Sequence, residues 1–225
     1  KIVQLEKNVG FANALNIGIS YVRCKYILRV DPDDFIDEKR IELQYQYMEN
    51  NPEIDILGSN CYYYHDGLKK VVGKSKYKLV HQEILDTYAN AGNGLSNGCI
   101  ICKADILKKN LYNQNNVPAE EYDIFSRILL ANYKSANLRQ YLLYYRIHGK
   151  SVTNSIKYKT IRKVYQLNSL YFNKRTNPIL IYLKYLHIKH YRKYLFNYGR
   201  PMGYINIAIS IIARPLAVIN RFFKS

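Results

Sequence analysis

The sequence predicts an α/β fold with a mostly parallel sheet and helices on both of its faces, followed by a basic helical region. Short apolar runs alternate with helical periodicity, and an acidic segment follows one of those runs directly. Residues 1–150 carry twenty basic and all seventeen acidic residues, whereas residues 151–225 carry fourteen basic and no acidic residue. This asymmetry predicts two domains, over residues 1–153 and 154–225.

The first part of the chain alternates between the two kinds of element. We expect strands over residues 2–5, 26–30, 54–60 and 138–147, and helices over residues 11–22, 37–48, 82–88 and 120–132. Residues 61–78 predict a hairpin or an excursion beside a site, and the glycine-rich residues 92–98 predict a flexible loop. Strands that are joined through helices run parallel to one another, which is the reason for expecting a parallel sheet.

An acidic motif follows the second expected strand. Asp31 and Asp33 are two residues apart, so on an extended chain they point to the same face together with Arg29. Paired carboxylates at the carboxyl end of a strand suit a hard divalent cation, which in turn neutralises a diphosphate. The alternative is an acidic turn whose carboxylates cap the next helix.

Several further motifs occur in a fixed order with the acidic one. They are Asn8-x-Gly10, Leu15-Asn16-x-Gly18, Tyr26-Ile27, Arg29-x-Asp31-x-Asp33-Asp34, Arg40 with Gln44, Asn51-Pro52-x-Ile54-Asp55, Glu120-Glu121-Tyr122-Asp123-Ile124, and Tyr145-Arg146-Ile147-His148 before Ser151-Val152. In this order the sequence resembles the family 2 glycosyltransferases of the GT-A fold over residues 1–153. The resemblance implies a GT-A type, Rossmann-like sheet. It also implies inverting, metal-dependent transfer of a sugar from a nucleotide-sugar donor, with UDP as the expected nucleotide.

The resemblance assigns roles to individual residues. Donor-binding residues would be Asn16, Arg29, Asp31, Asp33 and Asp34. Asp33 and His148 would bind Mg²⁺ or Mn²⁺. Glu121 takes the place of the general base, but the family has Asp there, so Glu120 stays a second candidate. The loop that ends with Asn97 and Gly98 would contact the acceptor, which we expect to be a glycan or a lipid-linked sugar in bacterial surface polysaccharide synthesis.

One departure from the family leaves a rival interpretation open. A complete member begins with a strand and an acidic turn that hold the nucleotide base, and we expect this segment to be missing ahead of Lys1. The rival is therefore a non-catalytic remnant or binding module. The sequence also contains no Trp, so the Q-x-x-R-W motif of processive synthases is absent and transfer of single sugars is expected.

The basic region has helical periodicity, with Tyr, Leu and Ile interleaved among Lys and Arg. Such a pattern suits an anionic membrane surface, and we expect residues 154–225 to hold the protein peripherally on the cytoplasmic face of a membrane. Solvated helices that pack on the body are the first alternative. Nucleic acid is the second, but we expect no nucleic-acid partner because no recognised nucleic-acid module is present.

Overall fold

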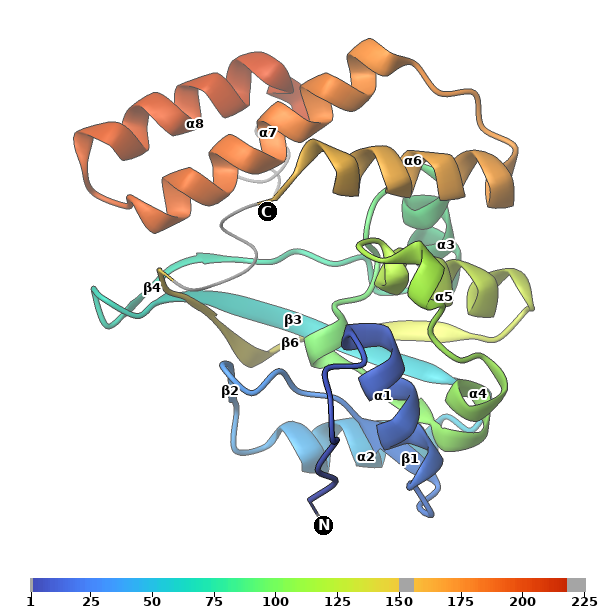
Figure 1. The fold of residues 1–225 in the computed structure, drawn as a ribbon. Coiled ribbons are helices and arrows are strands. Elements are labelled where there is room, and N and C mark those ends of the chain that lie inside the picture. The colour runs from blue at the N-terminus through green and yellow to red at the C-terminus, as the bar shows by residue number, and fades with distance from the viewer. Residues whose placement is uncertain (1, 150–155, 218–225) are drawn as a thin grey trace.

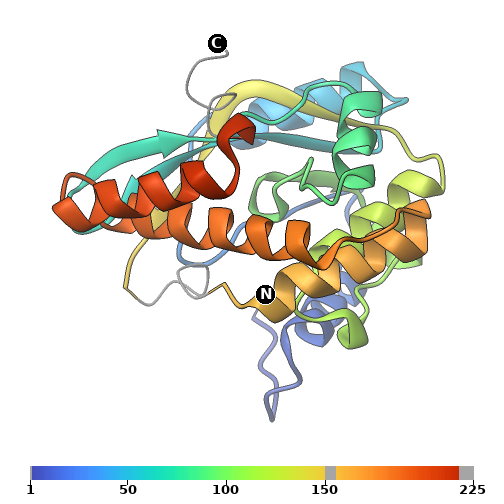
Figure 2. The same ribbon diagram turned by 90° about the horizontal axis from the view of Figure 1, so that it is seen from above.

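The computed structural model describes residues 2–149 and 156–217. Figure 1 shows a central sheet with helices on both sides, and Figures 1 and 2 together show α6, α7 and α8 as a layer over one side of it. The helices are α1 (Phe11–Ser20), α2 (Arg40–Asn50), α3 (His81–Ala89), α4 (Ala104–Lys109), α5 (Glu120–Leu130), α6 (Tyr158–Phe172), α7 (Pro178–Phe196) and α8 (Pro201–Ala213), with short 3₁₀ turns η1 (Asn97–Cys99) and η2 (Gln114–Asn116). The mixed α/β class and the helical C-terminal region are confirmed.

The sheet has six strands and the order β1-β5-β3-β6-β2, with β4 paired to the free part of β3. The strands are β1 (Tyr26–Leu28), β2 (Phe35–Ile36), β3 (Ile56–His65), β4 (Lys70–Lys74), β5 (Ile101–Lys103) and β6 (Ser135–Ile147). The predicted hairpin within residues 61–78 is confirmed, because β3 and β4 pair antiparallel across a tight turn.

The expectation of mostly parallel pairing is wrong in detail. Within the described ranges only β3 and β6 pair in parallel. β5 runs antiparallel to both β1 and β3, so β1, β3 and β6 point the same way. The order of strands and helices thus predicts these three directions correctly. It does not reveal that the three-residue β5 inserts between β1 and β3, because so short a segment carries no periodicity of its own.

The start of the chain differs from the expectation as well. Residues 2–5 form no strand, and Ile2 is exposed. α1 begins directly after Gly10, whose φ is +84° and whose N–H donates to Asn8 Oδ1 at 2.9 Å. A positive φ favours glycine, which gives the Asn8-x-Gly10 motif a structural role at the beginning of the helix.

The main core joins the first part of the chain to the C-terminal region. α5 contributes Ile124, Phe125 and Ile128 to this core, and Leu167 of α6 belongs to the same cluster. The side chain of Asn168 in α6 donates to the carbonyl oxygens of the last turn of α3 and to the hydroxyl of Tyr122. α6 is therefore packed into the body. The predicted domain boundary at residues 153 and 154 lies outside the described residues.

α7 and α8 cover the far end of the sheet. Tyr191 and Leu195 of α7 pack with Val72 of β4 and Ile147 of β6. Of the helices that the structure describes, none combines the length and the apolar character needed to cross a bilayer.

Candidate functional site

The acidic motif forms a turn between β1 and β2. β1 ends at Leu28, and the N–H of Asp34 donates to the carbonyl of Asp31 at 3.1 Å, which closes the turn. The three carboxylates consequently have different partners. The expectation that Asp31 and Asp33 share a strand face is wrong, because the extended segment ends before the motif begins.

Arg29 joins the acidic turn to the beginning of α5. Its Nη2 lies 2.7 Å from Asp31 Oδ1, and its Nη1 lies 3.8 Å from Glu121 Oε1. The amide of Asn97 in η1 donates to the same Glu121 oxygen at 2.7 Å, and the hydroxyl of Tyr112 donates to Asn97 Oδ1 at 3.0 Å. Four segments that are distant in sequence thus meet around one guanidinium and one carboxylate.

Asp33 and His148 face each other. His148 Nε2 lies 3.0 Å from Asp33 Oδ2, at the point where β6 has just ended. A carboxylate and an imidazole are both ligands for divalent transition metals, and Mg²⁺ or Mn²⁺ commonly takes one or two protein ligands with substrate phosphates completing the shell. Among the described residues, no three His, Cys, Asp or Glu side chains gather as a metal site. The residues present fit an ion shared with a bound diphosphate, and not an ion held by the protein alone.

Asp34 is the most deeply placed carboxylate of the turn. Its Oδ1 accepts from the N–H of Arg146 at 2.9 Å, while its buried Oδ2 has no hydrogen-bond partner. Burial raises the pKa of Asp34 to about 6, the Arg146 N–H opposes that rise, and the charges of Asp31 and Asp33 add to it. Asp31 and Asp33 have Arg29 and His148 as partners, so the unpartnered Asp34 Oδ2 is the acceptor of this turn that remains open to a cation.

Gly98 packs directly against the carboxylates. A β-carbon at this position would lie 3.3 Å from Asp31 Oδ2 and 3.6 Å from Asp34 Oδ2. Asn97 and Gly98 are both buried, and the Asn97 amide is engaged with Glu121 and Tyr112. Asn97 and Gly98 therefore lie against the carboxylates of the site, and their contact with the acceptor stays a prediction.

Asn16 acts at a distance from the acidic turn. Its amide donates to the carbonyl of Tyr112 at 2.8 Å and accepts from the N–H of Tyr112 at 2.9 Å. This pairing fixes Tyr112, whose hydroxyl supports Asn97 and so Glu121. Asn16 therefore supports the site through two intermediates, and the structure shows no direct link from it to the turn.

The two candidate bases have different environments. Loss of surrounding water raises the pKa of Glu121, and the charge of Arg29 and the Asn97 hydrogen bond oppose the rise. Burial also raises the pKa of Glu120, whose Oε2 is buried without a hydrogen-bond partner. The Glu121 side chain keeps 39% of its surface exposed and lies in the Arg29 network. Glu121 is thus both held in place and accessible.

Two residues of α2 support the site from beneath; the sequence placed this pair among the motifs of the family resemblance but assigned it no role. Arg40 is fully buried, donates from Nη2 to the carbonyl of Arg29 at 2.8 Å and from Nε to Gln44 Oε1 at 3.0 Å. Gln44 Nε2 donates to the carbonyl of Cys99 at 2.7 Å. Their i, i+4 spacing places both on one helix face, which is the signal that could have indicated a shared supporting role. Tyr112 offered no such signal.

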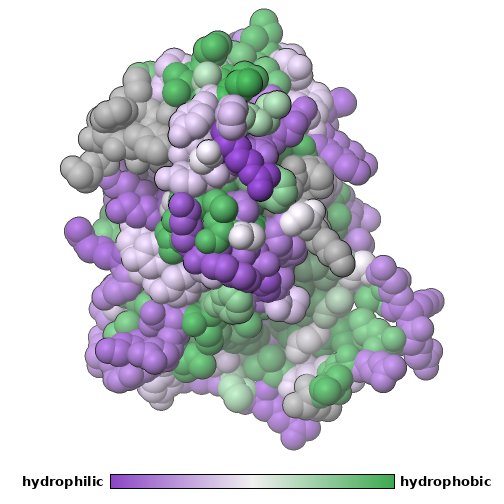
Figure 3. Space-filling model, turned by 90° about the vertical axis from the view of Figure 1, so that its left-hand side faces the viewer, coloured by the Kyte–Doolittle hydropathy of each residue, from purple (hydrophilic) through white to green (hydrophobic). Residues whose placement is uncertain are grey.

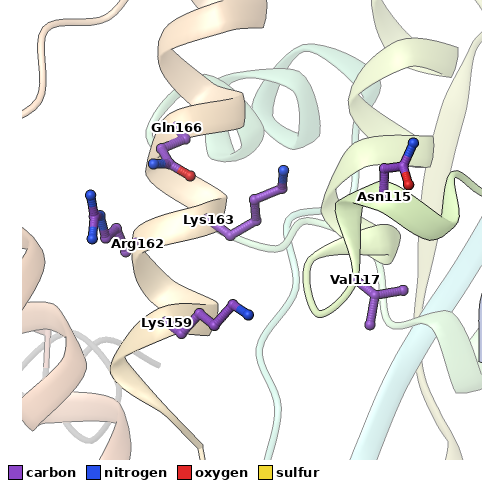
Figure 4. Close-up of a pocket in the computed structure, with 6 residues that line it drawn as sticks. All are labelled: Asn115, Val117, Lys159, Arg162, Lys163 and Gln166. Atoms are coloured by element: carbon purple, nitrogen blue, oxygen red, sulfur yellow. The ribbon is translucent and has the colours of Figure 1, made fainter.

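A separate cavity of about 390 Å³ lies between η2 and the first turns of α6 (Figure 4). Three of its lining side chains are cationic: Lys159, Arg162 and Lys163. Val117 lines the other side and stands three residues before Glu120, so the cavity borders the loop that leads into α5.

Residues 1–111 match the family model described as Glycosyl transferase family 2. The chain is a member of this family over that region. An uncharacterized glycosyltransferase of Methanocaldococcus jannaschii is 30% identical over 176 residues, which are 77% of this chain and 60% of that protein. The O-antigen biosynthesis glycosyltransferase WbnJ of Escherichia coli is 29% identical over 63% of this chain and 55% of that protein.

The fold has solved counterparts among the glycosyltransferases. The mannosyltransferase PcManGT from Pyrobaculum calidifontis, solved in complex with GDP-Man and Mn²⁺, superimposes with a TM-score of 0.53 over 100% of this chain and 64% of that chain, at 11% identity. This likeness confirms the GT-A-like fold that the sequence resemblance implied. The chain spans about 60% of the length of the Methanocaldococcus relative.

Proposed function

We propose that this chain carries the catalytic site of an inverting, metal-dependent glycosyltransferase, which moves a sugar from a nucleoside diphosphate sugar to an acceptor hydroxyl. One observation carries the proposal. Arg29 lies 2.7 Å from Asp31 and 3.8 Å from Glu121, so the acidic turn suited to a donor lies beside a carboxylate suited to act as a base. Family 2 membership of residues 1–111 supports the same assignment.

Glu121 is the residue that we assign to the acceptor proton. The described contacts engage its Oε1 with Asn97 and Arg29, so Oε2 is the oxygen that takes the proton as the acceptor oxygen attacks the anomeric carbon. Attack from the side opposite the leaving nucleoside diphosphate inverts that carbon. The raised pKa of Glu121 makes its carboxylate a stronger base than an ordinary glutamate, which favours this proton transfer near neutral pH.

Asp33 and His148 are the residues that we assign to Mg²⁺ or Mn²⁺. Their facing side chains at 3.0 Å and the neighbouring buried Asp34 Oδ2, which has no hydrogen-bond partner, support this role. When bound, the ion supplies positive charge to the diphosphate of the donor and of the leaving group. Arg29 and Asp34 fix the shape of the turn around it. The Mn²⁺ present with the mannosyltransferase of similar fold is consistent with the assignment.

The acceptor that we propose is a glycan or a lipid-linked sugar in surface polysaccharide synthesis, used at the cytoplasmic side of a membrane. A relative named for O-antigen biosynthesis supports this class. The cationic cavity beside the beginning of α5 also supports it, because Lys159, Arg162 and Lys163 suit a phosphate-bearing acceptor.

Release of nucleoside diphosphate from a panel of UDP- and GDP-sugars tests the proposal. With Mn²⁺ present we expect the full chain to release diphosphate, and EDTA or Asp33→Asn to abolish the release. A chain that binds neither nucleotide sugar nor Mn²⁺, or that is equally active in EDTA, contradicts the metal-dependent mechanism and favours the non-catalytic remnant.

A further inference from the structure

α8 presents its apolar side to the outside. Five large apolar side chains on its outer face are exposed, among them Ile212 at 81% and Tyr204 at 65%; the others are Met202, Ile205 and Ile211. Its buried positions are occupied by small or polar residues, Gly203, Asn206, Ser210 and Ala213. A surface helix of a soluble protein normally has the reverse arrangement, with the apolar stripe toward the core.

Contacts with α7 fix this orientation. Ser210 Oγ donates to the carbonyl of His187 at 3.1 Å, and Asn206 Oδ1 lies 2.7 Å from His190 Nδ1. A β-carbon on Gly203 would lie 2.4 Å from the carbonyl oxygen of Asn197, so only glycine fits there. Rotating α8 to bury its apolar face would break these hydrogen bonds and place bulky side chains where there is no room. The outward apolar face is therefore built into the packing.

Positive charge lies at both ends of this face. Arg200 immediately precedes α8 and Arg214 immediately follows it, and both are exposed. No acidic residue occurs anywhere in residues 151–225. Figure 3 shows apolar side chains gathered toward the top of the molecule, where α8 lies.

These charges limit what can cover the face. A second copy of the chain would bring two cation-rich, acid-free surfaces together, which electrostatic repulsion opposes. An anionic bilayer supplies both an apolar layer for Ile205 and Ile212 and a negative surface for the flanking arginines.

We propose that α8 lies flat in the headgroup region of an anionic membrane, with its outer face toward the lipid chains. At about 1.5 Å per residue, its 13 residues form a contact roughly 20 Å long. The inference deepens the proposed function, since it places the transferase where a lipid-linked acceptor would be found. In this arrangement α8 contacts the membrane, and α6 lies outside the bilayer.

Tryptophan fluorescence can locate the contact, because the chain contains no Trp. The full chain would be prepared as Ile212→Trp and, as a matched control, as Leu170→Trp, since Leu170 on α6 is also 72% exposed. Vesicles of phosphatidylcholine with one quarter phosphatidylglycerol would be added at low salt. We expect a blue shift of emission for Ile212→Trp, no shift for Leu170→Trp, and a much weaker shift with phosphatidylcholine alone.

Vesicle sedimentation gives the second measurement. Ile205→Ser with Ile212→Ser should lower the fraction bound at least tenfold, while Leu170→Ser should leave it unchanged; circular dichroism confirms the fold of each variant. Equal loss in both variants, or no binding at low salt, overturns the proposal. The proposal is also overturned if the protein self-associates without lipid and the Ile205→Ser, Ile212→Ser variant does not, since a second copy of the chain would then cover the outer face of α8. Neither measurement needs catalysis, so an inactive protein that binds vesicles through α8 contradicts only the proposed function.

Discussion

Replacing Gly98 by alanine would test whether the close spacing of the carboxylates is required for transfer. The added β-carbon would lie 3.3 Å from Asp31 Oδ2 and 3.4 Å from Leu143 Cδ2. Contacts this short force the neighbours to move by a few tenths of an ångström. Leu143 is fully buried, so the carboxylate is the group that yields, and its movement strains the 2.7 Å contact between Asp31 and Arg29.

The expected effect follows from how strongly catalysis depends on position. A misplacement of about 1 Å can cost about a hundredfold in rate, so a few tenths of an ångström should lower kcat/KM about three- to tenfold. Stability should change little. Gly98 has no positive φ, so alanine fits the backbone, and the gain of about 0.4–1 kcal/mol from a stiffer unfolded chain offsets the crowding.

Gly18→Ala is the matched control for this substitution. Gly18 lies inside α1, and a β-carbon there would have no neighbour within 4 Å. We expect this variant to be about 1 kcal/mol more stable with unchanged activity. Steady-state release of nucleoside diphosphate and thermal melting would be measured on both variants. Full activity of Gly98→Ala would refute the argument. So would a loss of activity that comes with a lower melting temperature, because unfolding would then explain the loss.

Four further predictions concern charged groups. Glu121→Gln should lower kcat by about 10²–10⁴-fold with little change in the KM for donor, and Glu120→Gln should be much milder; the reverse result would make Glu120 the base. Because the pKa of Glu121 is raised, the wild-type rate should fall with decreasing pH already above the ordinary glutamate range, about 4.3, in a pH–rate profile. His148→Ala, like Asp33→Asn, should weaken Mn²⁺ binding in the presence of a nucleoside diphosphate, measured by calorimetry, without lowering the melting temperature. Burial lowers the pKa of Lys184 to about 7. Between about pH 7 and 10.5 the unfolded chain therefore binds more protons than the folded one, and the free energy of unfolding should rise with pH by at most about 1.4 kcal/mol per pH unit. Lys184→Met should remove this slope in urea unfolding, and an unchanged slope would contradict the argument.

Much of the fold could be predicted because its elements carry periodicity. α5 shows apolar residues at helical spacing. The strands expected over residues 54–60 and 138–147 exist as β3 and β6, although β3 continues to His65 and β6 already begins at Ser135. β5 and β2 have three and two residues, too few for a pattern, so the antiparallel pairings could not be anticipated. The short β2 exists because it pairs with the far half of β6, which is a tertiary contact.

The site could be predicted only where chemistry and spacing coincide. Asp31, Asp33 and Glu121 lie in recognisable acidic motifs, and the structure places them in one region. The network that orients them could not be found in this way, although Asn97 was expected as an acceptor contact. Asn97 and Tyr112 are fifteen residues apart and belong to irregular segments, and their hydrogen bond depends on how the loops fold back on the core.

The C-terminal helices cannot be a detachable arm, because they hold the helix that carries the proposed base. Tyr122 and Asp123 directly follow Glu121; the Tyr122 hydroxyl accepts from Asn168 at 2.9 Å, and Asp123 Oδ1 accepts from the hydroxyl of Tyr171. α6 therefore fixes the first turn of α5, and α7 packs on α6 and α8 in turn. If α8 lies on a membrane, this chain of contacts sets the height of Glu121 above the bilayer. An acceptor that extends from a lipid would then meet the base at a distance determined by the packing of three helices.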